Sequence, residues 1–242
     1  MLQSIFLLTF LLAAAALSHN LQRHLQTDRN DACPPTGFST KQNFEPTTYI
    51  TKTWYSLKQL EVQFQEEDSF YCVRAQYTLD TKKNWWCRLF FMCDRLRIKV
   101  NNRGRIGSVD GPVDEANLYA FIKDSSEPSK LRVGPRILPP IINGPYWVLE
   151  AGTYAELLSG TNEFESTDYE WALISGGPPT IESNGKCTPG IPGPETRNGF
   201  WYFSSNPVPP EGVMEALDTL ASETYGIDIS LLRPVVQEGC TH

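Results

Sequence analysis

Apolar and polar side chains alternate over several short stretches of the chain, and this two-residue period predicts β-strands. Residues 70–79 carry apolar or aromatic side chains at every second position, and residues 96–100 alternate apolar with basic side chains. The next four residues, Asn-Asn-Arg-Gly at 101–104, have the composition of a turn. Several short strands separated by turn residues indicate a β-sandwich or a β-barrel. Further strands are expected at residues 118–122, 130–133, 146–150, 169–175 and 199–204.

Near the end of the chain the apolar period changes to that of an amphipathic helix. Apolar residues recur at helical spacing between Val213 and Ala221. Residues 209–211 (Pro-Pro-Glu) suit the first turn, and Gly226 suits the end of the helix. We expect the apolar stripe to pack on its own domain, with a partner surface as the alternative.

Two stretches are expected to be loops. Residues 176–198 are dense in Gly and Pro and predict a long surface loop. Residues 80–94 hold Cys87 and Cys93 among the aromatic side chains Trp85, Trp86, Phe90 and Phe91. If these rings are exposed, they mark a contact site for a protein partner. If they cap the fold, they belong to its core.

The first residues have the pattern of a secretory signal peptide. Residues 5–17 are apolar apart from Thr9 and end in small side chains. The run is shorter than the roughly 20 residues that span a bilayer, so an uncleaved anchor is the lesser alternative. We expect a signal peptide at 1–18, a disordered polar arm at 19–32, one domain at 33–242, and a secreted, extracellular protein.

Composition and cysteine content fit that compartment. The formal net charge of −7 argues against nucleic acid as a partner, because nucleic acid needs clustered Lys and Arg. Six cysteines behind a signal peptide predict three disulfide bonds, and six cysteines allow 15 pairings. No Cys-x-x-Cys pair occurs and the three histidines lie near the chain ends, so no metal site and no cofactor are expected.

Four motifs then occur in a fixed order along the chain. They are Cys33-Pro34 with Phe44, Tyr49 and Trp54; the stretch Gly-Pro-Tyr-Trp-Val-Leu at 144–149; Thr167-Asp168-Tyr169; and the aromatic strand at 200–205. In this order they resemble the lipocalin family, in particular its apolipoprotein D-like members. The resemblance implies an all-β fold, an eight-stranded up-and-down antiparallel barrel with one C-terminal helix packed outside.

Two positions depart from the family pattern. Lys52 stands where a glycine usually precedes the tryptophan, and Ser205 stands where an arginine usually covers it. In the family this tryptophan, here Trp54, closes the floor of the barrel. We therefore expect a different closure of the floor around Trp54 in an unchanged fold.

The resemblance also implies a disulfide pairing and a ligand site. It pairs Cys33 with Cys187 and Cys72 with Cys240, which leaves Cys87 and Cys93 to pair with each other. It places Tyr77, Asn102, Tyr146 and Trp201 at the ligand pocket. The alternatives are that the aromatic rings only fill a small barrel and that Asn102 is a turn residue.

The function implied is binding and transport of a small hydrophobic ligand in the barrel, such as a fatty acid, a sterol, a retinoid or a carotenoid-like molecule. A lipocalin-fold enzyme acting on a lipophilic substrate and a secreted interaction or effector protein are the alternatives. No histidine lies within the expected barrel, so we expect no catalytic residues. Paired carboxylates, Asp168 or Glu170 with Glu150, are the remaining catalytic candidates.

One further stretch bears on partners. Residues 137–142 combine Ile137, Leu138, Ile141 and Ile142 with two prolines. We expect a packed loop there. A lining of the barrel mouth and a peripheral membrane contact are the alternatives.

Overall fold

The computed structural model describes residues 32–81, 96–135, 143–161 and 163–241. The expected signal peptide, nearly all of the expected arm, and the Cys87–Cys93 pair with its aromatic neighbours lie outside the described residues. The apolar stretch at 137–142 lies outside them as well.

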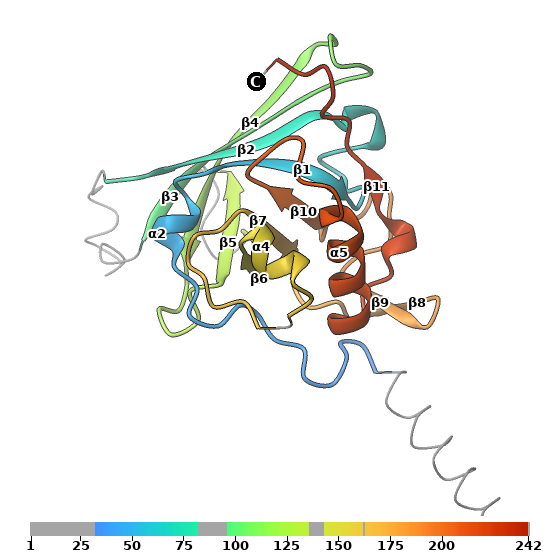
Figure 1. Ribbon diagram of the computed structural model, residues 1–242. Helices are drawn as coiled ribbons and strands as arrows, with labels where there is room; N and C mark the ends of the chain where they lie inside the picture. The colour runs from blue at the N-terminus through green and yellow to red at the C-terminus, as the bar shows by residue number, and fades with distance from the viewer. Residues whose placement is uncertain (1–31, 82–95, 136–142, 162, 242) are drawn as a thin grey trace, which may run out of the picture.

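Eight antiparallel strands of the described chain form a closed barrel (Figure 1). Neighbouring strands pair in an up-and-down order, and β10 pairs with β1 to close the barrel. This arrangement confirms the expected fold class. The barrel strands are β1 (Thr53–Gln59), β2 (Tyr71–Leu79), β3 (Arg97–Arg105), β4 (Val113–Ile122), β5 (Lys130–Pro135), β6 (Gly144–Gly152), β7 (Trp171–Ser175) and β10 (Phe200–Ser204).

Short elements complete the chain. A hairpin of β8 and β9 lies between β7 and β10, and β11 adds to the edge of β1. These elements are β8 (Ile181–Ser183), β9 (Lys186–Thr188), β11 (Arg233–Pro234), α2 (Pro46–Tyr49), α4 (Tyr154–Leu158), α5 (Val213–Thr219) with its continuation η3 (Leu220–Thr224), and the 3-10 turns η1 (Glu67–Ser69) and η4 (Ile229–Leu231).

The predicted turn at 101–104 is wrong. These residues lie inside β3, where Asn102 pairs with Ala75 of β2 and Ala116 of β4. Pairing on both sides outweighs the low intrinsic strand propensity of Asn and Gly. The turn comes later, at 106–112, where Gly107 has a φ of 76° that suits glycine.

The two larger hydrophobic cores of the described residues lie on the two faces of the barrel wall. The inner core fills the closed end of the barrel around Trp54, Tyr169 and Phe203. The outer core lies between the barrel and the C-terminal helix, where Val213, Leu217 and Ala221 are fully buried. Figure 1 shows α5 beside the barrel. This confirms that the helix packs on its own domain, although it begins at Val213, after the predicted opening at 209–211.

The predicted surface loop at 176–198 is partly wrong, because the middle of the segment is buried. The backbone N–H of Cys187 donates to Gly226, and the N–H of Asp228 donates to Cys187. The carboxylate of Asp228 also accepts hydrogen bonds from Ser183 and Asn184. The segment is therefore fastened to the chain that follows the helix.

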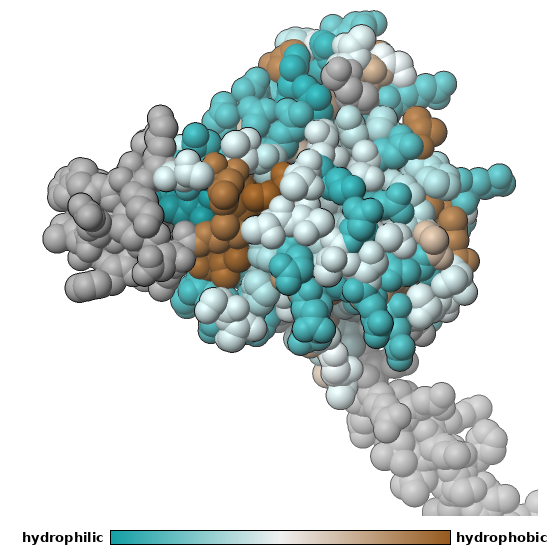
Figure 2. Space-filling model, turned by 60° about the vertical axis from the view of Figure 1, so that its left-hand side comes forward, coloured by the Kyte–Doolittle hydropathy of each residue, from teal (hydrophilic) through white to brown (hydrophobic). Residues whose placement is uncertain are grey.

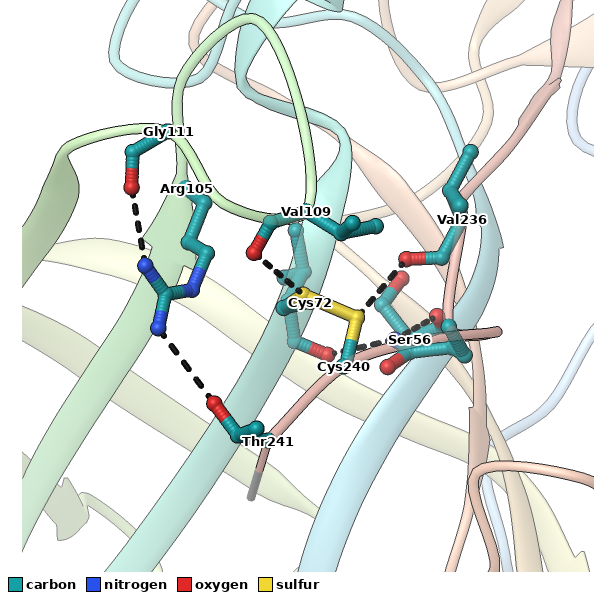
Figure 3. The surroundings of a disulfide bond; sticks show 10 residues. Ser56, Cys72, Arg105, Val109, Gly111, Val236, Cys240 and Thr241 are labelled. Atoms are coloured by element: carbon teal, nitrogen blue, oxygen red, sulfur yellow. Dashed lines mark hydrogen bonds between the residues drawn. A yellow bond between two sulfur atoms is a disulfide. The ribbon is translucent and has the colours of Figure 1, made fainter.

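The C-terminal tail fills a seam between β1 and β2 (Figure 3). The side-chain amide of Gln237 donates to the carbonyls of Ser56 on β1 and Val73 on β2. The N–H of Cys72 donates to Val236 at 2.8 Å. A disulfide bond between Cys72 and Cys240 holds the tail in this place, and a second bond joins Cys33 to Cys187. Both are pairs that the resemblance implies.

Candidate functional site

The barrel encloses a cavity of about 430 Å³. Inward-facing residues of the strands form its wall, mainly small or branched apolar side chains such as Val73, Ala75, Val100 and Val133. The cavity opens at the end of the barrel that carries the β1–β2 loop and the turn between β3 and β4. Phe64, 62% exposed, lies on this rim.

The four residues expected at the ligand pocket all line this cavity: Tyr77, Asn102, Tyr146 and Trp201. Each reaches it from a different strand, namely β2, β3, β6 and β10. Asn102 faces the cavity between two alanines, Ala75 and Ala116. Two narrow neighbours leave open space around its amide. The role of the four pocket residues in ligand binding stays a prediction.

A third tyrosine lies beneath the cavity, and the sequence pattern assigned it no role in a site. Tyr49 ends the short helix α2, which covers the closed end of the barrel. Its hydroxyl lies 2.7 Å from the hydroxyl of Tyr146, which in turn lies 2.9 Å from that of Tyr77. The deep end of the cavity is therefore a chain of three hydrogen-bonded phenols.

Burial governs the acidity of these phenols. Loss of solvent raises the pKa of Tyr77 to about 12, and raises those of Tyr49 and Tyr146 well above their usual value. At neutral pH all three hydroxyls are protonated. The deep end of the cavity is uncharged and polar.

The same shifts predict that the protein loses stability at alkaline pH. Tyr202 and Tyr225, on the outer side of the wall, also have a pKa raised mainly by burial. Above pH 10 the unfolded chain ionises its tyrosines while the folded chain keeps them protonated. We expect the free energy of unfolding to fall by about 1.4 kcal/mol per pH unit for each such tyrosine above pH 10.

Urea unfolding at pH 8, 10 and 11 measures this slope. The Tyr202→Phe variant is the control. It removes one titrating group, so the free energy of unfolding should fall less steeply with pH, by the contribution of one tyrosine. Equal stability at pH 8 and pH 11 would contradict the prediction.

A buried amide on the cavity wall was missed by the sequence pattern. Asn143 is 6% exposed, and its Oδ1 has no hydrogen-bond partner. It lies against Gly134, where an added Cβ would come within 2.4 Å of that oxygen. Because Gly134 has no side chain, the amide group of Asn143 can pack against its backbone. A lone Asn next to a Gly-Pro pair carries no sequence signal of its own.

The floor of the barrel is closed by aromatic rings around Trp54. Tyr49 stacks on Trp54 with ring centroids 4.6 Å apart, and Phe203 lies 6.4 Å away on a near-parallel plane. The indole N–H of Trp54 donates to the carbonyl of Tyr49. Ser205, at the position of the expected arginine, donates its N–H to the carbonyl of Glu170. Stacked aromatic rings thus cover Trp54 in this floor.

The second motif lies beside that floor. Tyr169 is fully buried, and its hydroxyl accepts a hydrogen bond from the N–H of Glu45. Asp168 is exposed and lies 2.8 Å from Lys52, the residue that replaces the usual glycine. Thr167 is exposed. One departure from the family pattern is thus joined to the motif by an ion pair.

The carboxylates considered for catalysis do not meet at the cavity. Glu150 pairs with Lys41 at 2.9 Å, and Glu170 accepts a hydrogen bond from the N–H of Tyr154. Asp168 pairs with Lys52. None of the three lines the cavity, so the structure does not assemble the predicted carboxylate pair there.

The described segments lack both a metal cluster and a membrane-spanning helix. No cluster of three His, Cys, Asp or Glu side chains suited to a metal ion occurs in residues 32–81, 96–135, 143–161 and 163–241. Over the same ranges, no helix has the length and apolar character needed to cross a membrane. On the face shown in Figure 2, hydrophilic side chains predominate and hydrophobic residues gather in one patch.

Comparison with known proteins identifies the architecture. No family model and no curated protein matches the sequence. Among solved structures, lobster apocrustacyanin A1 and apocrustacyanin C2 each superpose with a TM-score of 0.51 at 15% identity. Each match covers 86% of this chain and 92% of the other. Both proteins are lipocalins. The chain has the lipocalin fold. At this identity the likeness is one of fold alone.

Proposed function

We propose that the protein is a secreted, apolipoprotein D-like lipocalin that carries a small hydrophobic ligand in its barrel. The single observation that carries this proposal is the cavity of about 430 Å³ inside the barrel. Its volume falls in the range of small-molecule sites, and its wall is apolar with a few polar groups. Each methylene group buried there would contribute about 0.8 kcal/mol to binding.

The polar groups give this cavity the means to orient a ligand. Tyr77, Tyr146 and Trp201 combine broad apolar faces with one hydrogen-bonding atom each. The amide of Asn102 faces the same space without a partner among the described residues. We propose these four residues as the ligand contacts. Two disulfide bonds in the described chain support a secreted protein.

Ligand uptake tests the proposal directly. An organic extract of the purified protein is analysed by mass spectrometry, and the emptied protein is titrated with the fluorescent probe N-phenyl-1-naphthylamine. We expect the probe to bind with a Kd of about 1 μM or tighter, as burial of an apolar molecule in a preformed cavity allows. A protein that carries nothing and binds no apolar probe contradicts the proposal.

A pair of neighbouring substitutions locates the binding. Ala116 lines the cavity, whereas Asn117 lies next to it on the outer face of β4. Ala116→Trp fills the cavity and is expected to weaken probe binding by at least about tenfold, because a filled cavity cannot remove apolar ligand surface from water. Asn117→Trp is expected to leave the affinity unchanged. Equal effects of both changes would place the probe elsewhere.

A further inference from the structure

The outer face of β2, β3 and β4 carries charged and amide side chains on adjacent strands (Figure 1). Ala75, Asn102 and Ala116 are cross-strand partners that line the cavity, so the residues next to them in each strand lie on the opposite side of the sheet. We call this surface the outer polar face. It consists of Arg74, Gln76 and Thr78 of β2, Arg97, Lys99, Asn101 and Arg103 of β3, and Glu115, Asn117 and Tyr119 of β4.

Cations outnumber carboxylates on the outer polar face, although the whole chain has a formal net charge of −7. Arg97 has a carboxylate of its own, because it pairs with Asp80 at 3.8 Å. Glu115 is the one carboxylate of the face itself, beside three further cations, Arg74, Lys99 and Arg103. A local excess of positive charge on an acidic protein attracts an anionic partner to this place.

Glu115 does not neutralise these cations by direct contact. Its Oε1 accepts hydrogen bonds from the side-chain amides of Asn101 and Asn117, at 2.8 and 3.2 Å. These bonds and, to a lesser extent, the charges of Arg103 and Arg74 lower the pKa of Glu115. No ion pair joins Glu115 to either arginine along the described chain. Arg74 and Arg103 lie directly opposite each other, and like charges in this position repel. An anion bound beside them relieves that repulsion.

A depression of about 250 Å³ lies in the same face. Its lining is mostly amide and hydroxyl groups, with one cation: Gln76, Thr78, Asn101, Asn117, Tyr119 and Lys99. An amide offers a donor and an acceptor side by side, which are the groups that neighbouring sugar hydroxyls need. Lys99 and Arg103 lie four residues apart on β3, which is about 13 Å in a strand. The cations are therefore spaced for a ligand with several anionic groups.

The side chains of the face favour a polysaccharide over other polyanions. Binding to a lipid surface combines cations with apolar side chains that enter the lipid, and the outer polar face contains no aliphatic side chain. Binding to single-stranded nucleic acid uses aromatic rings that stack on bases. The ring of Tyr119 already has the guanidinium group of Arg97 over it, 5.7 Å from the centroid.

We infer that the outer polar face binds a linear polysaccharide that carries sulfate or carboxylate groups. Its hydroxyls lie in the depression against the amides, and its anionic groups pair with Lys99, Arg74 and Arg103. This site is separate from the proposed carrier function. Arg74 and Arg103 also line the barrel cavity, so the experiment must distinguish the face from the cavity.

Titration of the protein with heparin, followed by calorimetry, tests the inference. Lys99→Gln/Arg103→Gln removes two cations of the face and is expected to bind heparin at least about fivefold more weakly, with a shallower dependence on NaCl. Lys186→Gln/Arg233→Gln is the matched control, because it removes two cations that lie outside the face. It is expected to leave the affinity for heparin nearly unchanged. Circular dichroism checks that both variants fold like the original protein.

Further titrations need no substitution. At one NaCl concentration, the original protein is expected to bind heparin more tightly than a single-stranded DNA oligonucleotide or vesicles of phosphatidylserine and phosphatidylcholine in equal parts. Uncharged dextran is expected not to bind, because it lacks the anionic groups. Heparin is expected not to displace N-phenyl-1-naphthylamine from the barrel, because the two ligands occupy different sites.

Each of several results would overturn the inference. The original protein could fail to bind heparin, or the two double variants could bind it equally weakly. Tighter binding of DNA or vesicles than of heparin would assign the face to another class of partner. Displacement of the probe by heparin would place the anion at the cavity. Binding of the probe alone tests the carrier function, which stands or fails independently of heparin.

Discussion

Replacing Cys72 and Cys240 together with alanine is expected to lower the free energy of unfolding by about 5 kcal/mol. The bond joins residues 168 positions apart, so its loss releases a very large loop in the unfolded chain. Alanine keeps a Cβ at position 72, whose φ is 54° in this protein. The backbone cost of that left-handed conformation is therefore equal in both proteins and does not enter the difference.

The tail gives this bond a structural consequence beyond chain entropy. Residues 235–237 hold the seam between β1 and β2 through backbone bonds and the amide of Gln237. Without the disulfide, these contacts must hold the tail alone, and we expect faster hydrogen exchange at β1 and β2 than in the rest of the barrel.

Urea unfolding followed by circular dichroism measures the loss. Thr241→Ala is the matched control, because it removes only the contact to Arg105 at 3.5 Å (Figure 3). That variant is expected to lose less than about 0.5 kcal/mol, as surface substitutions do. A loss below about 1 kcal/mol in the double variant, against the 5 expected, would show that non-covalent contacts suffice to hold the tail.

Replacing Lys41 with methionine is expected to lower the free energy of unfolding by about 3–5 kcal/mol, the second largest effect of a substitution at neutral pH. Lys41 is 6% exposed, and its ammonium pairs with Glu150 and donates to the carbonyl of Phe164. Glu150 also accepts a hydrogen bond from the hydroxyl of Tyr225. Removing the cation leaves a carboxylate largely buried among these groups without its counter-ion.

A double variant distinguishes the lost charge from lost packing. In Lys41→Met/Glu150→Gln neither charge is left, so we expect it to be more stable than Lys41→Met alone. Lys52→Met is the control on an exposed pair, where loss of the contact to Asp168 is expected to cost less than about 1 kcal/mol. If Lys41→Met and Lys52→Met lower the free energy of unfolding equally, the buried ion pair contributes no more to stability than the exposed one.

This pair has a consequence for the candidate site. Lys41 lies in the segment that leads to Phe44 and α2, and the N–H of Lys41 donates to the carbonyl of Val148 on β6. The segment holds Tyr49 under the cavity, where its hydroxyl meets Tyr146. Loosening the segment is therefore expected to disturb the phenol cluster as well as the stability of the barrel.

The elements themselves could be predicted from local patterns, within limits set by burial. β2 was recognised because one face of it is buried, and the period of two follows from that. Residues 113–117 of β4 are exposed, so no alternation marks them and the predicted strand began only at 118. The turn prediction at 101–104 failed for the related reason that pairing partners lie far away in the sequence.

The candidate site likewise contains some residues that could be predicted from the sequence and others that could not. Tyr77 and Tyr146 were expected at the pocket because the residues next to them in the sequence resemble the lipocalin family. The contact between Tyr49 and Tyr146 spans 97 positions, and no local pattern signals it. The unpartnered oxygen of Asn143 is equally invisible, because it depends on Gly134 across the sheet.

The sequence by itself determined the all-β class, the late helix and the six cysteines, because periodicity and residue chemistry are local properties of the chain. Only the tertiary structure decided where β3 turns, how Lys52 meets Asp168, and which hydroxyls meet beneath the cavity. Those features depend on the register and closure of the barrel, which bring distant residues within hydrogen-bonding distance.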